Sequence, residues 1–296
     1  MPDLSIRPLE EQDIATVVQW ARGEDFAPGH GDLSIYRHTD RQGIWLGWHQ
    51  GAPVGSIAGV RYNDAYGFIG LYLVQSDFRG LGFGHQLWQT ALNHLDGVSC
   101  IGLEAAPNLI EHYEEWGFRS ESRTIRWQWF NRPSEARVPF FRSFGDSPVL
   151  HTMSGAEIPL TAINDYDSKR EATPRPHFLN QWLSHPAGDV LALIDRCGEC
   201  HGFGRIRPCL LATGQGWRVG PLLADSPELA SLLLQQLLVS HPGVVLVDSP
   251  EQNAGATDVL SGIGFKQVSS TTRMYRGPLP SITTNDVFAL ACLELG

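Results

Sequence analysis

The stretch from Phe68 to Leu95 (FIGLYLVQSDFRGLGFGHQLWQTALNHL) constrains the fold of this chain more than any other. It opens with an apolar run, Ile69 to Val74, which has the length of a strand and no helical period. A turn with three alternating glycines follows, at Gly80, Gly82 and Gly84. The apolar residues after the turn recur at helical spacing, at Leu87, Trp88, Ala91, Leu92 and Leu95. The stretch is therefore predicted to form a strand, a glycine-rich turn and a helix.

Such a unit has the chemistry of an anion-binding site. Glycine lets the backbone take up positive φ and approach a ligand closely. The first turn of a helix offers unpaired N–H groups and the positive end of the helix dipole, and together these hold phosphates. Arg79, at the start of the turn, adds a fixed positive charge. We expect this turn to bind a phosphate or a diphosphate.

Two kinds of phosphate-binding turn compete for these glycines. A dinucleotide-binding turn reads G-x-G-x-x-G, with an acid about 20 residues further on. Glu104 lies at about that spacing, but Leu87 replaces the third glycine. The second kind fits better, because Arg79-x-x-Gly82-x-Gly84 matches the R/Q-x-x-G-x-G/A motif. On this motif the chain resembles the GNAT superfamily, the acetyl-CoA-dependent N-acetyltransferases.

A second motif supports the same resemblance. The run Tyr113-Glu-Glu-Trp-Gly117-Phe118 is similar to the family's Y-x-x-x-G-F motif, and it lies at the right separation from the glycine turn. The resemblance implies an enzyme that moves the acetyl group of acetyl-CoA to a primary amine of a small molecule, directly in a ternary complex. The alternatives are a non-catalytic acyl-CoA-binding sensor and a dinucleotide-binding protein.

The resemblance also implies which residues bind the coenzyme. Its pantetheine would run along the strand at Tyr72, and its diphosphate would lie on the backbone N–H groups of the glycine turn. The residues expected to bind the coenzyme are Tyr72, Leu73, Val74, Arg79, Gly80, Leu81, Gly82, Phe83, Gly84, His85 and Asn108.

Two residues are expected to carry the chemistry. Tyr113 occupies the family's position for the general acid, and a phenol can donate a proton to the leaving thiolate. Many GNAT enzymes use a glutamate early in the central strand as the base, but this chain has Phe68 near that position. Glu104, at the end of the neighbouring strand, is the expected replacement, and a substrate counter-ion is its alternative role.

The acceptor site is predicted from polar and aromatic residues near the cleft that the resemblance implies. Asp25, Phe26 and Asp32 lie in or beside a loop where GNAT proteins place a segment that covers the substrate. Arg61 follows the third strand, and Asp248 ends a strand of the second half. Acids with an arginine would suit an amine that also carries a carboxylate or hydroxyls.

The second half of the chain repeats the first in degenerate form. The pair Leu103-Glu104 before Gly117-Phe118 is echoed by Val247-Asp248 before Gly264-Phe265. The second copy lacks the R-x-x-G-x-G motif, so it is not expected to hold coenzyme A. We predict a mixed α/β fold with tandem GNAT units: a catalytic domain over residues 1–131, a linker over 132–147 and a degenerate domain over 148–296 that walls the substrate pocket.

Composition excludes several other classes of protein. Asp and Glu number 32 against 22 Lys and Arg, which gives a net charge of −10 and argues against nucleic-acid or anionic-membrane partners. No apolar run is long enough to cross a membrane, and no secretory signal opens the chain, so a cytoplasmic location is expected. The sequence carries no indication of oligomeric state.

The cysteines are expected to be reduced thiols without a metal. Their number is odd, five, and no export signal is visible. The run Cys197-Gly-Glu-Cys200-His201 has the C-x-x-C-H pattern of haem attachment, but it lies between two strand-like runs and is predicted to be a hairpin tip. Only Cys209 is close enough to add a further ligand, so a zinc site is not expected.

Overall fold

The structure, a computed structural model, describes residues 3–132, here the N-terminal half, and 150–296, the C-terminal half. The predicted linker over 132–147 lies outside the described residues except for its first residue. The N-terminal half contains β1 (Ser5–Pro8), α1 (Ile14–Gly23), α2 (Asp32–Thr39), β2 (Ile44–His49), β3 (Ala52–Arg61), β4 (Tyr66–Val74), α3 (Phe83–His94), β5 (Cys100–Ala105), α4 (Ile110–Glu114) and β6 (Arg119–Asn131).

The C-terminal half follows a related order of elements. It contains β7 (His151–Ser154), α5 (Leu160–Ser168), α6 (Pro176–Ser184), β8 (Asp189–Ile194), β9 (Cys200–Leu210), β10 (Gln215–Ala224), α7 (Pro227–Leu238), β11 (Gly243–Pro250), α8 (Ala254–Ile263), β12 (Lys266–Arg276) and β13 (Val287–Ala289). Short 3₁₀ turns lie at Glu11–Asp13, Ser76–Phe78, Pro107–Leu109, Gly155–Glu157 and Thr284–Asp286.

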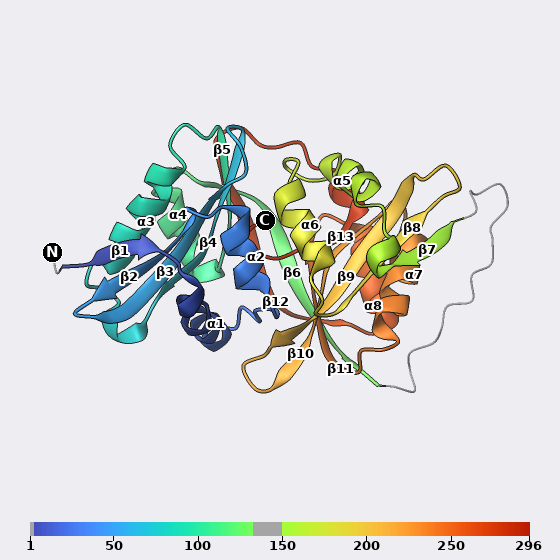
Figure 1. Ribbon diagram of the computed structural model, residues 1–296, viewed down its shortest axis with the longest axis horizontal. Coiled ribbons are helices and arrows are strands. Elements are labelled where there is room, and N and C mark those ends of the chain that lie inside the picture. The colour runs from blue at the N-terminus through green and yellow to red at the C-terminus, as the bar shows by residue number, and fades with distance from the viewer. Residues whose placement is uncertain (1–2, 133–149) are drawn as a thin grey trace.

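One mixed sheet runs through both halves (Figure 1). Its order is β1-β2-β3-β4-β5-β12-β6-β11-β10-β9-β8-β7, and β13 pairs with β10 beside this path. The predicted mixed α/β fold is confirmed, and the predicted hairpin around Cys197 and Cys200 is the β8–β9 pair. The sheet also contains two parallel pairs, β4–β5 and β10–β11.

The two halves exchange strands at the centre of this sheet. Strand β12, from the C-terminal half, pairs with β5 of the N-terminal half, while β6 of the N-terminal half pairs with β11. Strand β12 also pairs with β6. In the sheet, β12 therefore lies between two strands of the N-terminal half, and β6 lies between two strands of the C-terminal half. Backbone hydrogen bonds therefore join the halves, and their relative position is fixed by the sheet itself.

Helices cover both faces of the sheet, and two of them pack against each other between the halves (Figure 1). Helix α3 packs against β2, β3 and β4, and α7 packs against β8, β9 and β10. Helix α2 contacts α6, and the ring of Tyr36 stacks on that of Trp182 at 6.1 Å. One hydrophobic cluster runs continuously from α2 through α6 to Leu71 and Leu295, so the junction of the halves is part of the core.

Helix α2 was not predicted, and its first residue, Asp32, was expected in or beside a loop. The helix is short and follows a run rich in glycine and proline. Its apolar residues span barely two helical turns, which is too short for a helical period to stand out in the sequence. Its apolar side nevertheless buries Leu33, Ile35 and Tyr36. Tertiary packing against the other half, rather than intrinsic propensity, stabilises this helix.

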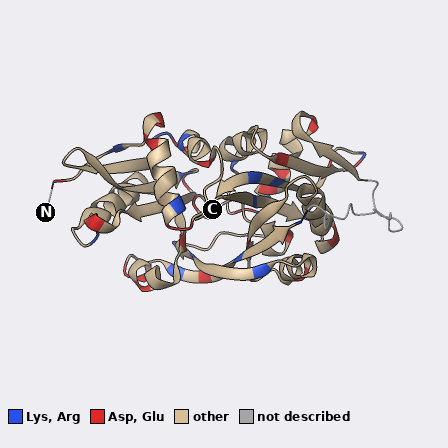
Figure 2. Ribbon diagram, turned by 90° about the horizontal axis from the view of Figure 1, so that it is seen from below, with Lys and Arg blue, Asp and Glu red and all other residues tan. Residues whose placement is uncertain are grey.

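The end of the chain lies between the two halves, as Figures 1 and 2 show. After β13, residues 290–296, here the tail segment, run from the C-terminal half toward β4. The backbone N–H of Leu290 donates to the carbonyl of Asp248 at 2.8 Å, and the Tyr62 hydroxyl donates to the carbonyl of Leu295 at 3.1 Å. Arg175 donates to the carbonyl of Gly296 at 2.9 Å. The tail segment is thus held along most of its length.

Candidate active site

The central feature of the site is a fork between β4 and β5. The two strands pair in parallel only from Tyr66 to Ile69 of β4, and they separate beyond that point. A β-bulge lies there, because β4 inserts an extra residue against β3 and Leu71 has a φ of 48°. The edge of β4 that faces β5 is therefore left open at the residues that follow.

The glycine turn lies beside this fork. Gly82 has a φ of 84°, which favours glycine, and it precedes the first residue of α3. The first N–H groups of α3 consequently point out of the helix end beside the open strand edge. Arg79 donates to the carbonyl of Val74 at 2.8 Å and forms an ion pair with Glu24 at the end of α1.

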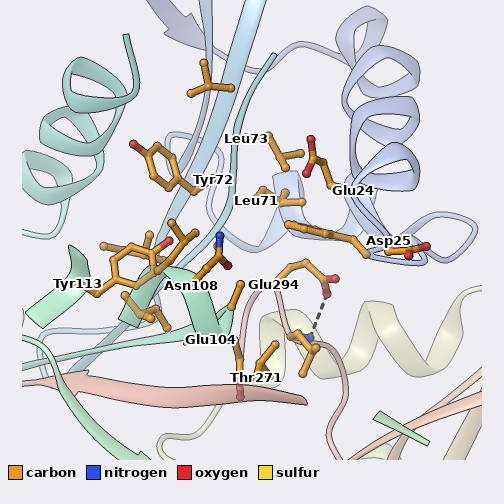
Figure 3. A pocket seen from close by; sticks show the side chains of 18 of the residues that line it. Glu24, Asp25, Leu71, Tyr72, Leu73, Glu104, Asn108, Tyr113, Thr271 and Glu294 are labelled. Atoms are coloured by element: carbon orange, nitrogen blue, oxygen red, sulfur yellow. Dashed lines mark hydrogen bonds between the residues drawn. The ribbon is translucent and has the colours of Figure 1, made fainter. Parts of the chain in front are cut away.

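A pocket of about 870 Å³, here the central pocket, lies at the fork between the two halves. Its wall combines the bulged strand β4, the glycine turn, the end of β5, the loop after α1, the strands β6, β11 and β12, and the tail segment (Figure 3). The pocket is thus built by elements from the whole length of the chain.

The structure brings most of the residues predicted to bind the coenzyme to this pocket. Those that line it are Tyr72, Leu73, Val74, Arg79, Gly80, Gly82, Gly84, His85 and Asn108. Two predicted residues do not line it: the side chain of Phe83 is fully buried, and Leu81 is 47% exposed. Both still contribute backbone to the turn, so their predicted role can rest only on their N–H groups.

Tyr113 projects into the central pocket from α4 (Figure 3). Its ring packs against Trp88 at 5.2 Å and Phe118 at 6.4 Å, which fixes its orientation. Burial, and then the neighbouring Tyr72, raise the pKa of the Tyr113 hydroxyl far above its ordinary value. The phenol therefore stays protonated at neutral pH and is available as a proton donor.

Glu104 also lines the central pocket, where three donors hold its carboxylate. It accepts hydrogen bonds from the Thr124 hydroxyl at 2.9 Å, the Thr271 hydroxyl at 2.6 Å and Nε of Arg273 at 2.7 Å. Its side chain is 3% exposed. These contacts hold the carboxylate in place, and the base role of Glu104 remains a prediction.

The residues predicted for the acceptor site divide into two groups. Asp25, Phe26 and Asp248 line the central pocket. Asp32 does not line it, because it is buried against Arg207 with hydrogen bonds of 2.9 and 3.0 Å. Arg61 lies elsewhere, where it binds Asp64 and the carbonyl of Asp96.

Several pocket residues were not predicted from the sequence. They include Glu24, Arg126, Ser269, Ser270, Thr271, Leu293 and Glu294. Most lie on strands whose partners are remote along the chain, so no local pattern indicates them. Glu294 carries the one visible signal, because it is an isolated acid within the apolar run VFALACLELG.

The corresponding fork of the C-terminal half is filled by the chain itself. Strands β10 and β11 pair in parallel only up to Val219 and Val247, as β4 and β5 do up to Ile69. Beyond that point β13 pairs with β10 at Leu222 and Leu223. The strand edge that is open in the N-terminal half is therefore occupied in the second copy.

Two features are absent from the described residues, 3–132 and 150–296. No group of three or more His, Cys, Asp and Glu side chains is arranged to hold a metal ion. No helix among them is both long and apolar enough to span a bilayer. All five cysteines are free.

Comparisons with known proteins agree with this architecture. Residues 11–118 match the model of the acetyltransferase (GNAT) family, and residues 163–289 match that of an acetyltransferase (GNAT) domain. The chain therefore belongs to the GNAT family, as a two-domain acyltransferase. This result favours the acyl-CoA interpretation of the glycine turn over the dinucleotide one.

Individual relatives cover nearly the whole chain. The holothin acyltransferase of a Pseudoalteromonas species is 29% identical over 98% of this chain and 94% of its own length. The uncharacterized N-acetyltransferase YitH of Bacillus subtilis is 21% identical over 97% of each chain.

Solved structures show the same fold. A putative acetyltransferase from Pyrococcus horikoshii has a TM-score of 0.80 and 22% identity, over 99% of this chain and 96% of its own. A tandem GNAT protein from the clavulanic acid biosynthesis pathway has a TM-score of 0.66 and 15% identity, over 94% and 100%.

Proposed function

We propose that this enzyme transfers the acetyl group of acetyl-CoA directly to a primary amine of a small molecule, in a ternary complex. One observation carries the proposal: the open edge of β4, the N-terminus of α3 and the hydroxyl of Tyr113 all face one pocket. The family indicates the class of reaction. This arrangement offers a place for the diphosphate of the coenzyme and another for its pantetheine.

The coenzyme would lie along the fork. Its diphosphate would accept hydrogen bonds from the N–H groups between Gly80 and His85, with Arg79 as the fixed charge. Its pantetheine would pair with the open edge of β4 in the manner of an added strand. A backbone N–H near Leu73 or Val74 would then polarise the thioester carbonyl, a contribution worth roughly 10²- to 10³-fold in rate.

The transfer needs one proton donor and one proton acceptor. The neutral amine nitrogen attacks the thioester carbon, the carbon–sulfur bond breaks, and Tyr113 donates its proton to the leaving thiolate. The nitrogen, positively charged after the attack, gives up a second proton, which returns to the phenolate of Tyr113 directly or through water. The amine must first lose a proton, and Glu104 is the proposed acceptor, directly or through water. In this proposal, residues 1–131 bind the coenzyme, and residues 148–296 form a wall of the pocket for the acceptor amine.

Two observations support a small acceptor. The central pocket is enclosed by both halves, and the strand exchange holds these walls together. The relative from Pseudoalteromonas carries the name holothin acyltransferase, which assigns that protein an acyl acceptor. Walls from both halves favour a small molecule over a polypeptide as the acceptor.

The test combines coenzyme binding with transfer. Calorimetry should show that acetyl-CoA binds the wild type and that Arg79→Glu combined with Gly82→Glu abolishes binding, because the diphosphate then meets two carboxylates. The wild type should also acetylate members of a panel of primary amines. Unchanged affinity in the double variant would overturn the coenzyme site, and NAD binding in place of acetyl-CoA would restore the dinucleotide alternative. Binding without transfer to any amine would instead indicate a sensor.

A further inference from the structure

The tail segment crosses the sheet at two equivalent glycines. A Cβ on Gly70 would clash with the carbonyl oxygen of Glu294, and a Cβ on Gly220 would clash with that of Leu290. Gly70 follows the last paired residue of β4, and Gly220 follows the last paired residue of β10 beside β11. The absence of a side chain at both positions lets the tail pass from the filled fork to the open one.

This path delivers the side chain of Glu294 to the central pocket. Glu294 lines the pocket, and its side chain is 6% exposed. Figure 3 shows it below Leu71 and Leu73, on the side of Glu24 and Asp25 and away from Tyr72 and Tyr113. In this view the carboxylate lies across the pocket from the proposed proton donor, Tyr113.

The carboxylate of Glu294 is held less tightly than the other buried carboxylates of the pocket. It accepts from the Tyr36 hydroxyl at 3.2 Å and the Leu293 N–H at 3.0 Å, and its contact with Arg218 is 3.4 Å long. Glu104 and Asp248, by contrast, each accept from an arginine at 2.7 Å. Glu294 thus retains acceptor capacity for a ligand, since a carboxylate offers about four lone-pair positions.

The charges around the pocket favour a cationic ligand there. Arg126 and Arg218 both bind Asp248, Arg79 binds Glu24, and Arg273 binds Glu104. Arg218 also contacts Glu294, so five carboxylates line the pocket and four arginines pair with them. An ammonium group that enters between Glu294 and Asp25 therefore meets net negative charge.

We propose that Glu294 is an acceptor-binding residue, whose carboxylate accepts a hydrogen bond from the ammonium group of a protonated amine and so positions it beside the bulge of β4. The inference rests on the proposed acetyl transfer and names its substrate class: amines that are cationic at neutral pH. The residue comes from the C-terminal half, which thereby contributes directly to the site.

The experiment compares Glu294→Gln with the wild type on two acceptors, 2-phenylethylamine, which is protonated at neutral pH, and aniline, which is neutral. The substitution keeps the shape of the side chain and removes its charge. We expect the KM for 2-phenylethylamine to rise about 10- to 100-fold, the range of one charge-assisted hydrogen bond, while the KM for acetyl-CoA is unchanged. The preference for the cationic acceptor should be lost.

Asp13→Asn is the matched control, because it removes a carboxylate that is also 6% exposed and paired with an arginine but does not line the pocket. A similar rise in the amine KM in this control, or an unchanged preference in Glu294→Gln, would overturn the role of Glu294. Wild-type activity on aniline alone would also overturn it while leaving acetyl transfer intact. If the enzyme binds acetyl-CoA but acetylates neither of these amines nor any amine of the wider panel, both the proposed function and this inference are wrong.

Discussion

At the scale of single residues, the site depends on side chains that are locked in place by their neighbours. Tyr113 is held by the aromatic cluster around Trp88, and its hydroxyl faces the pocket. Arg79 is held at the pocket by Glu24 and by the carbonyl of Val74. The two residues can therefore be tested separately, one for chemistry and one for coenzyme binding.

Tyr113→Phe removes only the proposed proton donor, because the ring and its packing remain. We expect kcat to fall about 10²- to 10⁴-fold, with the affinity for acetyl-CoA unchanged in calorimetry. Steady-state rates for the wild type and the variant provide the measurement. Equal kcat values would mean that the thiolate takes its proton from another donor.

Glu24→Gln should strengthen coenzyme binding, because the diphosphate has to compete with Glu24 for Arg79. The pair is half exposed, so the expected decrease in the Kd for acetyl-CoA is modest, up to about fivefold. Glu157→Gln, an exposed acid away from the pocket, controls for the change in net charge. A Kd that rises in Glu24→Gln alone would show that Glu24 supports the coenzyme instead of competing with it.

At the scale of elements, the sequence predicted the helices and strands that form through interactions between residues close together along the chain. The strand, glycine turn and helix from β4 to α3 followed from apolar spacing, as did the hairpin β8–β9. Helix α2 and strand β13 did not, since α2 packs against α6 and β13 is three residues long and pairs with β10. Glu294 escaped prediction for the same reason: it reaches the pocket only because β13 directs the tail there.

Strand β9 offers a test of how arginines are tolerated in this core. Arg205 and Arg207 both flank the ring of Trp182, at 4.8 and 4.2 Å, but only Arg207 has a carboxylate partner, Asp32. Nε and Nη1 of Arg205 have no hydrogen-bond partner among the described residues. Burial, and then the charge of Arg207, lower the pKa of Arg205 to about 9.

We therefore expect opposite results from two methionine substitutions, measured by urea unfolding. Arg207→Met leaves Asp32 buried without its partner and should cost about 3–5 kcal/mol of stability. Arg205→Met removes a buried charge that lacks a counter-ion and should be neutral or stabilising. Equal losses in the two variants would mean that Arg205 has a partner that its geometry does not reveal.

At the scale of the whole molecule, Asp248 ties the halves together. It binds Arg126 of β6 and Arg218 of β10, and its own backbone carbonyl holds the tail segment. Burial opposes the charged form, but the two arginines outweigh it and lower the pKa of Asp248 to about 2. The strand exchange and this ion-pair cluster had no signal in the sequence, because both join residues far apart along the chain.

The lowered pKa predicts acid sensitivity at this junction. Since the folded-state pKa lies below the ordinary value of 3.8, the stabilisation is complete above that pH and is lost as the pH falls toward 2. The loss from Asp248 is about 2 kcal/mol. Unfolding free energies measured across this range should fall less steeply in Asp248→Asn than in the wild type, and identical slopes would contradict the assignment.

The exchange of β6 and β12 also limits how reactants can enter. A clamshell motion, with the halves swinging apart about a hinge, would have to tear the backbone ladder between β5 and β12. The coenzyme and the amine must therefore enter through small local rearrangements at the rim of the pocket, such as release of the Glu24–Arg79 ion pair. The two halves keep their relative position throughout.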